Sequence, residues 1–356
     1  MRYLAILTVK NEGAFLLEWL AHHQAVGFTD FLVFSNDCSD GTDLMLDRLA
    51  ALGVVCHQRN PGPWPEGAQW AALKSADRHP LMAAADWVLF CDIDEFVNIH
   101  VGARTLPALL AALPKATAIP LTWRLFGNSG VVGFEDRPVC AQFEHAAPAE
   151  MGWPWRAALF KTLFRNDGSY RKLGVHRPRN PTPEGLARQR WYDGSGRALP
   201  ASYHKGRIFS AYGQNNYGLV QLNHYALGAM ESYVLKCDRG RANREASAFD
   251  MSYWVERNFC THTDRSVLAL APEVALRRDG LQADPELARL HAAAVQWRQD
   301  RFATLMLDEK FRALFGRLML TPPSQPLTPT AAARMAALGR RAALMKSETV
   351  SDRATD

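Results

Sequence analysis

The sequence predicts an α/β protein with a mostly parallel, doubly wound sheet that has helices on both faces. Two observations support this class. Short apolar runs rich in β-branched and aromatic residues alternate with amphipathic segments along the first hundred residues, and the connections between them are short. Strand–helix–strand units of this kind form parallel sheets with right-handed crossovers. A chain of 356 residues is long enough for one large domain or two small ones.

The N-terminal part of the chain alternates predicted strands and helices. In chain order these are strand 2–9, helix 14–26, strand 30–35, helix 43–52, strand 54–57, helix 70–79 and strand 87–91. Gly27 and Gly53 stand where the first two helices end, because glycine readily adopts the left-handed conformation of a C-cap. The first strand is followed by neither G-x-G-x-x-G nor a P-loop, which removes the main support for dinucleotide-binding and NTPase functions.

The remaining chain predicts fewer strands and more helix. In order, we expect helix 105–113, strand 118–126, a Gly-rich turn at 127–130, strand 161–165, strand 221–225, a helix with Glu231, Tyr233 and Lys236, an amphipathic helix over 285–320, a Pro-rich linker over 321–329 and a basic helix over 330–346. We expect the basic helix to pack on the core or to be partly disordered; the alternative is that it lies on an anionic membrane surface. The expected domains are 1–240 (halves of about 1–100 and 101–240), a helical extension over 241–320 and a tail over 321–356.

Bulk composition excludes several function classes. The chain is 48% apolar and 22% charged with a net charge of +5, and it carries no dense Lys/Arg run, so nucleic acid is not an expected partner. A basic cleft for a diphosphate and adhesion to an anionic membrane fit this charge equally well. The first strand begins within three residues of Met1, leaving no room for a signal peptide. Six scattered cysteines without a C-x-x-C pair favour a reducing cytoplasm.

An acidic motif follows the predicted buried strand 87–91. Asp92, Asp94 and Glu95 come directly after this apolar run, and ionised carboxylates resist burial unless they are paired or bind a metal. Because positions i and i+2 of an extended strand point to the same side, we expect Asp92 and Asp94 to share one hard cation, Mg²⁺ or Mn²⁺. The alternative is a strand end followed by a solvated acidic turn.

Polar residues also follow the first two predicted strands. Asn11 and Glu12 follow the first strand, and Asn36 and Asp37 follow the second. Their side chains are suited to the imide of uracil or to a ribose hydroxyl. Each of Asn36, Asp37 and Ser39 is also a good turn or helix-capping residue, so a structural role remains an equal alternative.

Four motifs occur in a fixed order along the chain. They are Lys10-Asn11-Glu12, Glu18-Trp19, Asn36-Asp37-Cys38-Ser39-Asp40-Gly41-Thr42 and Asp92-Ile93-Asp94-Glu95-Phe96. Together they resemble a family 2 glycosyltransferase, and more closely the family 2-like branch with K-N-E, E-W, S-x-D-G-T and D-x-D-E-F motifs, which is related to family 92. The resemblance covers residues 1 to about 240. It implies the glycosyltransferase A fold, a divalent metal and inversion at the anomeric carbon. It also implies a nucleotide-diphosphate sugar as the donor, and we expect a UDP-sugar.

The resemblance also suggests roles for individual residues. The expected donor contacts are Asn11, Glu12, Asp37, Asp92 and Lys161; the expected metal ligands are Asp92, Asp94 and His224; the candidate catalytic residues are Glu95, Glu150 and His176. Glu95 would orient the loop or touch the sugar. Glu150 is one of four carboxylates, with Glu135, Asp136 and Glu144, among which the spacing chooses no general base. His176 is equally well explained as a structural histidine.

The sequence differs from the family 2-like branch directly after Asn223-His224-Tyr225, where the branch commonly carries a positive charge. A Lys-Ser pair common there is replaced by Ala226-Leu227, so Lys236, Arg239 and Arg241 are the alternative sources of charge. The expected function is a metal-dependent, cytoplasmic glycosyltransferase of bacterial surface-glycan synthesis, with a glycan or lipid-linked acceptor and possible contact with the inner membrane face. The alternatives are a metal-dependent nucleotidyltransferase, which would need a better phosphate loop than Lys10-Asn11-Glu12-Gly13, and a non-catalytic sugar-nucleotide-binding module.

Overall fold

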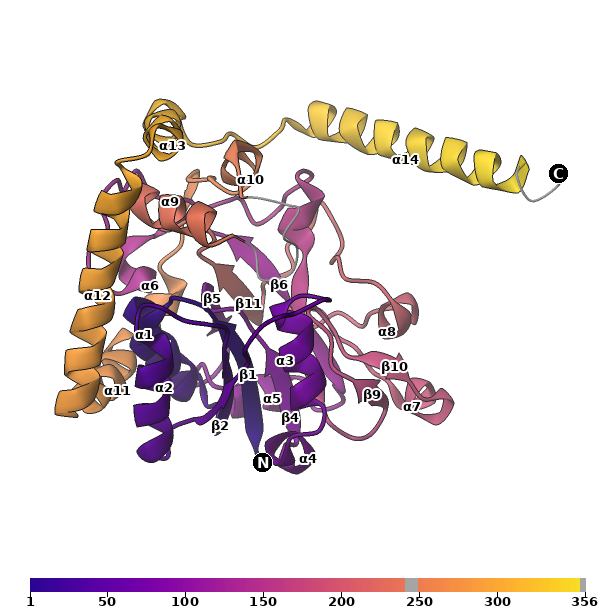
Figure 1. Ribbon diagram of the computed structural model, residues 1–356. Helices are drawn as coiled ribbons and strands as arrows, with labels where there is room; N and C mark the ends of the chain where they lie inside the picture. Colours follow the sequence, from indigo (N-terminus) through magenta and orange to yellow (C-terminus); the bar gives the residue numbers. More distant parts are fainter. Residues whose placement is uncertain (241–248, 353–356) are drawn as a thin grey trace.

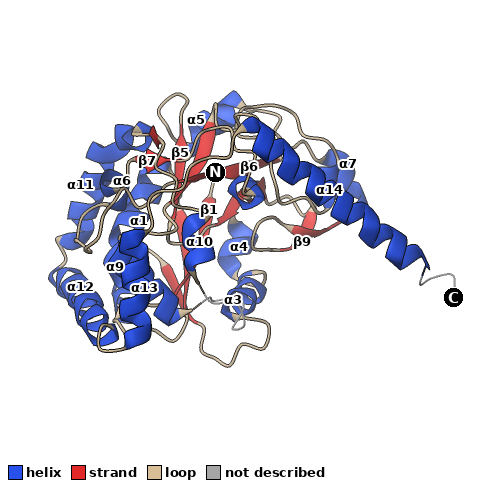
Figure 2. Ribbon diagram, turned by 90° about the horizontal axis from the view of Figure 1, so that it is seen from above, coloured by secondary structure: helices blue, strands red, loops and turns tan. Residues whose placement is uncertain are grey.

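The central element of the fold is a mixed sheet with helices on both faces (Figures 1 and 2). The computed structural model describes residues 1–240 and 249–352. In the described residues this sheet has eight strands in the order β3-β2-β1-β4-β8-β6-β11-β5. Its strands are β1 (Tyr3–Val9), β2 (Asp30–Ser35), β3 (Cys56–Arg59), β4 (Trp87–Phe90), β5 (Glu95–Ile99), β6 (Ala118–Leu125), β8 (Phe160–Arg165) and β11 (Val220–His224). Short two-stranded sheets pair β9 (Tyr170–Lys172) with β10 (Arg179–Pro181), and β7 (His145–Ala146) with β12 (His262–Thr263).

Strand direction changes across the sheet. The N-terminal strands β1 to β4 are parallel, as predicted, and β11 is parallel to β6. Strand β8 is antiparallel to both of its neighbours, and β5 is antiparallel to β11 at one edge. The carboxyl ends of β1, β2 and β4 therefore meet at one edge of the sheet, which brings the loops that follow these strands together.

The helices form two layers and a C-terminal group. They are α1 (Gly13–Val26), α2 (Thr42–Ala51), α3 (Ala68–Ala76), α4 (Pro80–Ala84), α5 (Leu106–Ala112), α6 (Val139–Gln142), α7 (Pro183–Arg188), α8 (Ser202–Lys205), α9 (Met230–Arg239), α10 (Met251–Val255), α11 (Ala271–Gln282), α12 (Pro285–Leu305), α13 (Glu309–Leu320) and α14 (Pro329–Asp352), with 3₁₀ turns η1 (Trp155–Ala158) and η2 (Ser266–Leu270).

The side chains of β1 point alternately to the two faces of the sheet and pack against the helices on each face. Ala5 and Leu7 face a core cluster that includes α1, α2 and α5, whereas Leu4 and Ile6 face a second cluster that includes α3. A strand buried on both faces in this way is typical of a parallel sheet. Leu287 and Ala294 of α12 belong to the first cluster, so the C-terminal helices share the main core.

Several elements differ from the sequence prediction. Strand β5 and helices α4 and α11 were not predicted, and β3 lies two residues later than expected. The predicted helix 285–320 is two helices, because the chain turns at Met306–Asp308 and the Asp308 side chain accepts a hydrogen bond from Lys310 N at 2.8 Å, which begins α13. The amphipathic pattern continues across this break and therefore does not reveal it.

The C-terminal region ends in a long helix. Helix α14 follows a segment without regular helix and extends away from the body of the molecule in both views (Figures 1 and 2). Among the described residues, none of the helices combines the length and the apolar character needed to cross a bilayer. Arg241 and residues 353–356 lie outside the described residues.

Candidate active site

The acidic motif turns instead of continuing as a strand. After β4 ends at Phe90, the Glu95 N–H donates to the carbonyl oxygen of Asp92 at 3.1 Å, which closes a turn before β5 begins. The side chains of Asp92 and Asp94 consequently have different partners. The expectation that an extended backbone places them on one side is wrong at this position.

Asp92 is held by two hydrogen bonds from different elements. Gln69 Nε2 of α3 donates to its Oδ1 at 2.8 Å, and Lys161 Nζ of β8 donates to its Oδ2 at 2.8 Å. Lys161 is fully buried, and it also lies 3.7 Å from Glu95 Oε2. Burial disfavours the charged amine, but the two carboxylates outweigh it and raise the pKa of Lys161, so the amine is protonated.

Asp94 pairs with a lysine from the following half of the chain. Lys236 Nζ of α9 donates to Asp94 Oδ2 at 2.8 Å and to the carbonyl oxygen of Ala226 at 2.7 Å. His224 Nε2 lies 3.7 Å from Asp94 Oδ1. Burial opposes ionisation of Asp94, but the Lys236 charge outweighs burial and lowers the pKa of the carboxyl below its usual range.

His224 is a neutral, buried imidazole. Burial lowers its pKa to about 3. Its ring stacks on Trp123 with 4.1 Å between ring centroids, and its Nδ1 has no hydrogen-bond partner within the described residues. A neutral imidazole is the form that binds a metal ion.

Glu95 is a buried support of the acidic loop. Its side chain is fully buried, its Oε2 accepts from Asp92 N at 2.8 Å, and its Oε1 accepts from Trp123 Nε1 at 2.6 Å. Burial raises the pKa of this carboxyl, while the nearby Lys161 charge opposes the increase. Glu95 therefore holds the backbone at Asp92 and does not line the cavity.

The Glu18-Trp19 motif also supports the site from α1. Trp19 Nε1 lies 3.1 Å from the carbonyl oxygens of both Asp92 and Glu95, so one indole N–H spans the acidic turn. The buried Glu18 carboxylate accepts from the backbone N–H groups of Val139 and Cys140 at 2.7 and 3.2 Å. This motif thus orders two loops around the site without reaching into it.

The turns after β1 and β2 bind each other. Asn11 adopts a left-handed conformation with φ of 56°, accepts from Ser39 N at 2.7 Å and donates to Ser39 Oγ at 3.1 Å. Asp37 is exposed, and its Oδ2 accepts from Gly62 N at 3.1 Å. Asp40 precedes α2 and accepts hydrogen bonds from Thr42 N at 2.9 Å and from Gly13 N at 3.0 Å. Hydrogen bonds within and between the two turns therefore account for part of the second motif.

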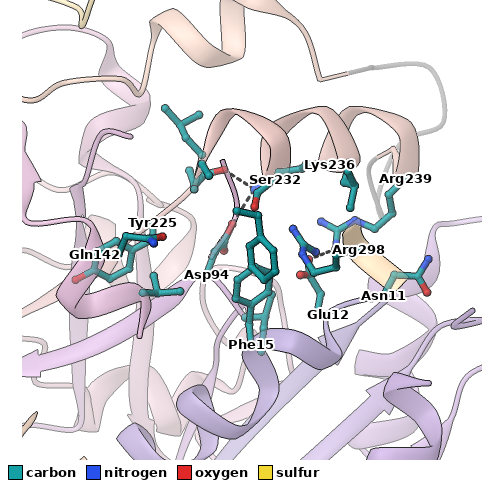
Figure 3. Close-up of a pocket in the computed structure, with 18 of the residues that line it drawn as sticks. Asn11, Glu12, Phe15, Asp94, Gln142, Tyr225, Ser232, Lys236, Arg239 and Arg298 are labelled. Carbon is teal, nitrogen blue, oxygen red and sulfur yellow. Dashed lines mark hydrogen bonds and ion pairs between the residues drawn. The ribbon is translucent and has the colours of Figure 1, made fainter. Parts of the chain in front are cut away.

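A cavity of about 440 Å³ lies beside these turns (Figure 3). Asn11, Glu12 and Asp94 line it, together with residues of α1, α6, α9 and α12. Glu12 forms an ion pair with Arg239 of α9, which also donates to the carbonyl oxygen of Lys10 at 2.9 Å. The structure therefore brings together Asn11, Glu12, Asp94 and Lys236, which come from three separate segments of the chain.

Other predicted residues lie outside the cavity lining. His176 is buried on the side of Lys161: its Nδ1–H donates to the Phe160 carbonyl oxygen at 3.0 Å, and burial lowers its pKa to about 4. Asp37, Asp92, Glu95, Lys161 and Glu150 do not line the cavity either, and Glu150 is exposed in a loop.

The other carboxylates considered as general base have distinct surroundings. Glu135 lines the cavity and pairs with Arg137 at 3.3 Å. Asp136 pairs with His291 at 3.1 Å, and Glu144 pairs with Arg265 at 2.6 Å. Of the four, Glu135 is the one that faces the cavity.

The fit of this site to a divalent metal is partial. Two carboxylates and a neutral imidazole are ligands that suit Mn²⁺, and Asp94 and His224 face each other. Asp92, however, uses both oxygens for Gln69 and Lys161. Within residues 1–240 and 249–352, no three His, Cys, Asp or Glu side chains gather closely enough to hold a metal ion.

Three residues important to this geometry were not singled out from the sequence as parts of the site. Gln69 reaches Asp92, Trp123 supports both Glu95 and His224, and Arg298 lines the cavity from α12. Trp123 had a signal, since it belongs to the W-x-x-F-G segment after a predicted strand. Gln69 and Arg298 had none, because each lies far in sequence from the motif that it approaches.

Sequence comparison relates the chain to glycosyltransferases. A glycosyltransferase family 92 protein of Ricinus communis is 27% identical over 103 residues, covering 28% of this chain and 18% of that protein. A second family 92 protein, from Oryza sativa subsp. japonica, is 26% identical over 125 residues, covering 34% of this chain and 21% of that protein. The chain thus spans about a fifth of the length of the curated relatives it matches. No protein-family model matches the chain.

Solved structures similar to this fold include two bacterial proteins. S. aureus TarS (1–349) in complex with UDP-GlcNAc is 18% identical over 38% of this chain and 37% of that chain, with a TM-score of 0.27. Glucosyl-3-phosphoglycerate synthase from Mycobacterium tuberculosis is 18% identical over 35% of this chain and 44% of that chain, with a TM-score of 0.25. At these TM-scores the structural likeness carries no argument about activity or ligands.

Two predictions are confirmed by these observations. The fold is an α/β fold in which a large, mostly parallel sheet is flanked by helices. The chain is similar in sequence to glycosyltransferase family 92 proteins, in agreement with the resemblance that its four motifs indicate.

Proposed function

We propose that this protein is a glycosyltransferase of the glycosyltransferase A fold that transfers a sugar from a nucleotide-diphosphate donor, a UDP-sugar, to an acceptor hydroxyl. The observation that carries this proposal is the position of Asp92 and Asp94 after β4, beside a cavity of about 440 Å³. Open α/β sheets bind ligands at the carboxyl ends of their strands, and small-molecule sites have volumes of roughly 300–1,000 Å³.

The proposed donor contacts lie on both sides of the acidic turn. Asn11 and Glu12 would contact the nucleoside from the cavity, and Asp37 would contact it from the exposed rim of the β2 turn. The two buried lysines supply positive charge near the leaving diphosphate, Lys161 beside Asp92 and Lys236 beside Asp94. Fixed positive charge at a developing anion lowers the barrier because it needs no reorganisation during the reaction.

A divalent cation is proposed at Asp94 and His224. Their facing side chains supply a carboxylate oxygen and a neutral imidazole nitrogen, and Asp92 would join them only by exchanging its hydrogen bonds with Gln69 and Lys161. When bound, such a cation offsets negative charge on a leaving diphosphate. Lys236 already occupies Asp94 Oδ2, so it competes with the cation for this carboxylate.

The proposed reaction inverts the anomeric carbon. It requires a carboxylate that accepts the proton of the acceptor hydroxyl, and Glu135 is favoured over Glu150 because Glu135 lines the cavity. Glu95 is proposed as a positioning residue, since both its oxygens accept hydrogen bonds within the protein. His176, which follows β9 and contacts the Phe160 carbonyl oxygen of β8, would orient Lys161. A glycan or lipid-linked acceptor in bacterial surface-glycan synthesis, at the cytoplasmic face of the membrane, remains the proposed setting.

The first test is thermal unfolding with a panel of nucleoside diphosphates, with and without Mn²⁺. A ligand that binds only the native state stabilises it by about 2.7 kcal/mol at a hundredfold excess over its Kd. We expect UDP to raise the Tm of the wild type more strongly with Mn²⁺, and Asp94→Asn to remove the Mn²⁺ effect. Asp30→Asn is the matched control, because Asp30 is also ion-paired but lies at the other end of β2. If no nucleoside diphosphate binds with or without metal, the proposal is wrong.

Product analysis separates the proposal from its two alternatives. A glycosyltransferase releases a nucleoside diphosphate from a nucleotide sugar. A nucleotidyltransferase instead releases pyrophosphate from a nucleoside triphosphate. A binding module would bind the nucleotide sugar at equilibrium without either product, including when simple sugar and lipid-linked acceptors are added.

A further inference from the structure

Arg298 is a buried cation at one end of the cavity. Its side chain comes from α12, is 5% exposed, and places its guanidinium 4.5 Å from the ring centroid of Phe15 and 4.9 Å from that of Phe134. Figure 3 shows it beside Arg239 and Glu12 in the cavity wall. Two aromatic rings therefore fix the orientation of this guanidinium.

Within the described part of the chain, Arg298 has no carboxylate partner. Among the described residues, its Nε has no hydrogen-bond partner, and no ion pair joins its guanidinium to an acidic side chain. The Asp40 charge attracts it, but the Asp40 oxygens accept hydrogen bonds from Gly13 and Thr42. Burial lowers the pKa of Arg298 to about 10, so the side chain still carries its charge at neutral pH. A buried charge without a partner is costly unless a ligand supplies one.

The other charges of the cavity balance one another. Four acidic side chains line it, and each pairs with one basic side chain that also lines it: Glu12 with Arg239, Asp94 with Lys236, Glu135 with Arg137, and Asp238 with Arg301. Lys10 and Arg298 complete the basic lining, and within the described residues neither has an acidic partner. Counted over the described residues, the cavity lining therefore has an excess of two positive charges.

Two features place this excess positive charge at one end of the cavity. Arg239, which binds Glu12, also donates to the Lys10 carbonyl oxygen, and the Arg298 and Arg239 charges repel each other. Arg239 pairs with the Glu12 carboxylate, and the Lys10 backbone and the Arg298 guanidinium both lie near Arg239 at this end of the cavity. An anion with two negative charges complements this arrangement, and a phosphate group has that charge at neutral pH.

We propose that Lys10 and Arg298 form a binding site for a phosphate group of a substrate. This site is built from the turn after β1 and from α12, so the C-terminal helices contribute directly to ligand binding. Its existence does not depend on the proposed function, but the origin of the phosphate does. The group is either part of the donor diphosphate or part of a phosphate-bearing acceptor, and the chemistry that recognises it is the same.

The test measures the affinity of the full chain for pyrophosphate, UDP and inorganic phosphate by isothermal titration calorimetry at one fixed salt concentration. We expect Arg298→Met to weaken at least one of these probes by tenfold or more, and Arg298→Lys to weaken it less. Arg289→Met is the matched control: Arg289 lies on the same helix, is exposed, pairs with Glu286 and does not line the cavity. The control variant should bind every probe as the wild type does.

The pattern of loss identifies the source of the phosphate. If the site holds the donor diphosphate, Arg298→Met weakens UDP and pyrophosphate by similar factors. If it holds an acceptor phosphate, Arg298→Met leaves UDP affinity unchanged and weakens inorganic phosphate in the presence of saturating UDP. Lys10→Met should reproduce the same pattern from the other side of the site.

The Tm of the Arg298→Met variant distinguishes a ligand-binding role of Arg298 from a structural one. Because Arg298 is buried and has no acidic partner among the described residues, Arg298→Met should not lower the Tm of the ligand-free protein, whereas it should remove the stabilisation by phosphate. Equal affinities of the wild type, Arg298→Met and Lys10→Met for all three probes would overturn the site. If instead the wild type binds pyrophosphate but no nucleoside diphosphate, the phosphate site stands and the proposed donor is wrong.

Discussion

The indole N–H of Trp123 donates a hydrogen bond of 2.6 Å to Oε1 of Glu95, and both side chains are buried. The other oxygen of Glu95 accepts from the backbone N–H of Asp92, and the Trp123 ring packs against the His224 ring with 4.1 Å between their centroids. Through Trp123, strand β6 therefore supports both the acidic turn at Asp92–Glu95 and the side chain of His224. The predictions below test this support and its consequences.

Trp123→Phe should destabilise the protein by removing the donor to a buried carboxylate. Hydrogen bonds to charged groups contribute about 1.5–3 kcal/mol, compared with about 0.5–1.5 kcal/mol for neutral pairs. Because burial raises the pKa of Glu95, the free energy of unfolding is measured by urea denaturation at pH 9, where it should fall by the larger amount. Trp191→Phe is the matched control, because Trp191 is also buried but donates to the neutral Gln189 amide at 2.9 Å. Equal losses in the two variants would contradict a charged Glu95.

Acidification should reduce the stability that Lys236 gives to the protein. The Lys236 charge outweighs burial and lowers the folded-state pKa of Asp94, so the ionised carboxylate contributes stability above its unfolded pKa of about 3.9. This contribution is lost as the pH falls through the folded-state pKa. The difference in unfolding free energy between wild type and Lys236→Met should therefore narrow from pH 6 to pH 3.

A surface pair provides the control for this pH dependence. Lys74 pairs with Glu66 at 2.6 Å, and both side chains are largely exposed. Exposed pairs contribute little to stability, so Lys74→Met should differ from wild type by a small, nearly constant amount over the same pH range. If Lys236→Met behaves in the same way, the Asp94–Lys236 pair is not the source of the effect.

Lys236→Met should also strengthen metal binding while weakening transfer. The substitution frees Asp94 Oδ2 from a competing cation, so the Kd for Mn²⁺ should fall. The rate of UDP release from a UDP-sugar should fall as well, because a positive charge near the leaving diphosphate is lost. Titration of Mn²⁺ followed by calorimetry, and turnover at saturating Mn²⁺, measure the two effects separately. An unchanged Mn²⁺ affinity would remove Asp94 from the proposed metal ligands.

Asp92 and Asp94 should respond differently to substitution. Since Asp92 is held by Gln69 and Lys161, Asp92→Asn should lower the Tm by disturbing a buried pair and should reduce Mn²⁺ affinity less than Asp94→Asn does. EDTA should weaken UDP binding by the wild type and leave UDP binding by Asp94→Asn unchanged. The opposite order of Mn²⁺ affinities would show that Asp92 is the principal ligand.

Gly13→Ala should destabilise the contact between α1 and α12. A Cβ atom at Gly13 would lie 2.8 Å from Cβ of Ala294, and overpacking of this kind costs about 1–3 kcal/mol. Gly280→Ala on α11 is the control: its Cβ would meet open space, so it should raise helix stability by about 0.5–1 kcal/mol. Urea denaturation measures both. A neutral Gly13→Ala would mean that α12 can move away from α1 at little cost.

Local pattern determined most of the N-terminal fold. Strand 30–35 is β2 itself, helix 14–26 is α1 within one residue, and Gly27 is its C-cap with φ of 108°. These predictions succeed because strand and helix periodicity and glycine caps depend on residues close in sequence. The helix break before α13 was missed because Asp308 breaks a helix without interrupting its apolar stripe.

Long-range pairing decided the elements that the sequence did not reveal. Residues 95–99 form a strand because β11 provides an antiparallel partner, in which Glu95 lies opposite His224. The direction of β8 between β4 and β6 likewise depends on neighbours that lie up to about 78 residues away in sequence, as the Trp87–Arg165 pair illustrates. A five-residue segment carries no local signal for such a partner.

The sequence by itself determined the parallel strands β1 to β4, the acidic residues that follow β4 and the similarity to family 92 glycosyltransferases that the matches confirm. Only the tertiary structure decided which charges meet. In the tertiary structure Asp92 pairs with Lys161, Asp94 pairs with Lys236, and the buried Glu95 accepts a hydrogen bond from Trp123. Arg298 lies in the cavity without an acidic partner among residues 1–240 and 249–352. The physical reason is that charge pairing depends on distance in space, and these partners lie between 28 and 142 residues apart in the chain.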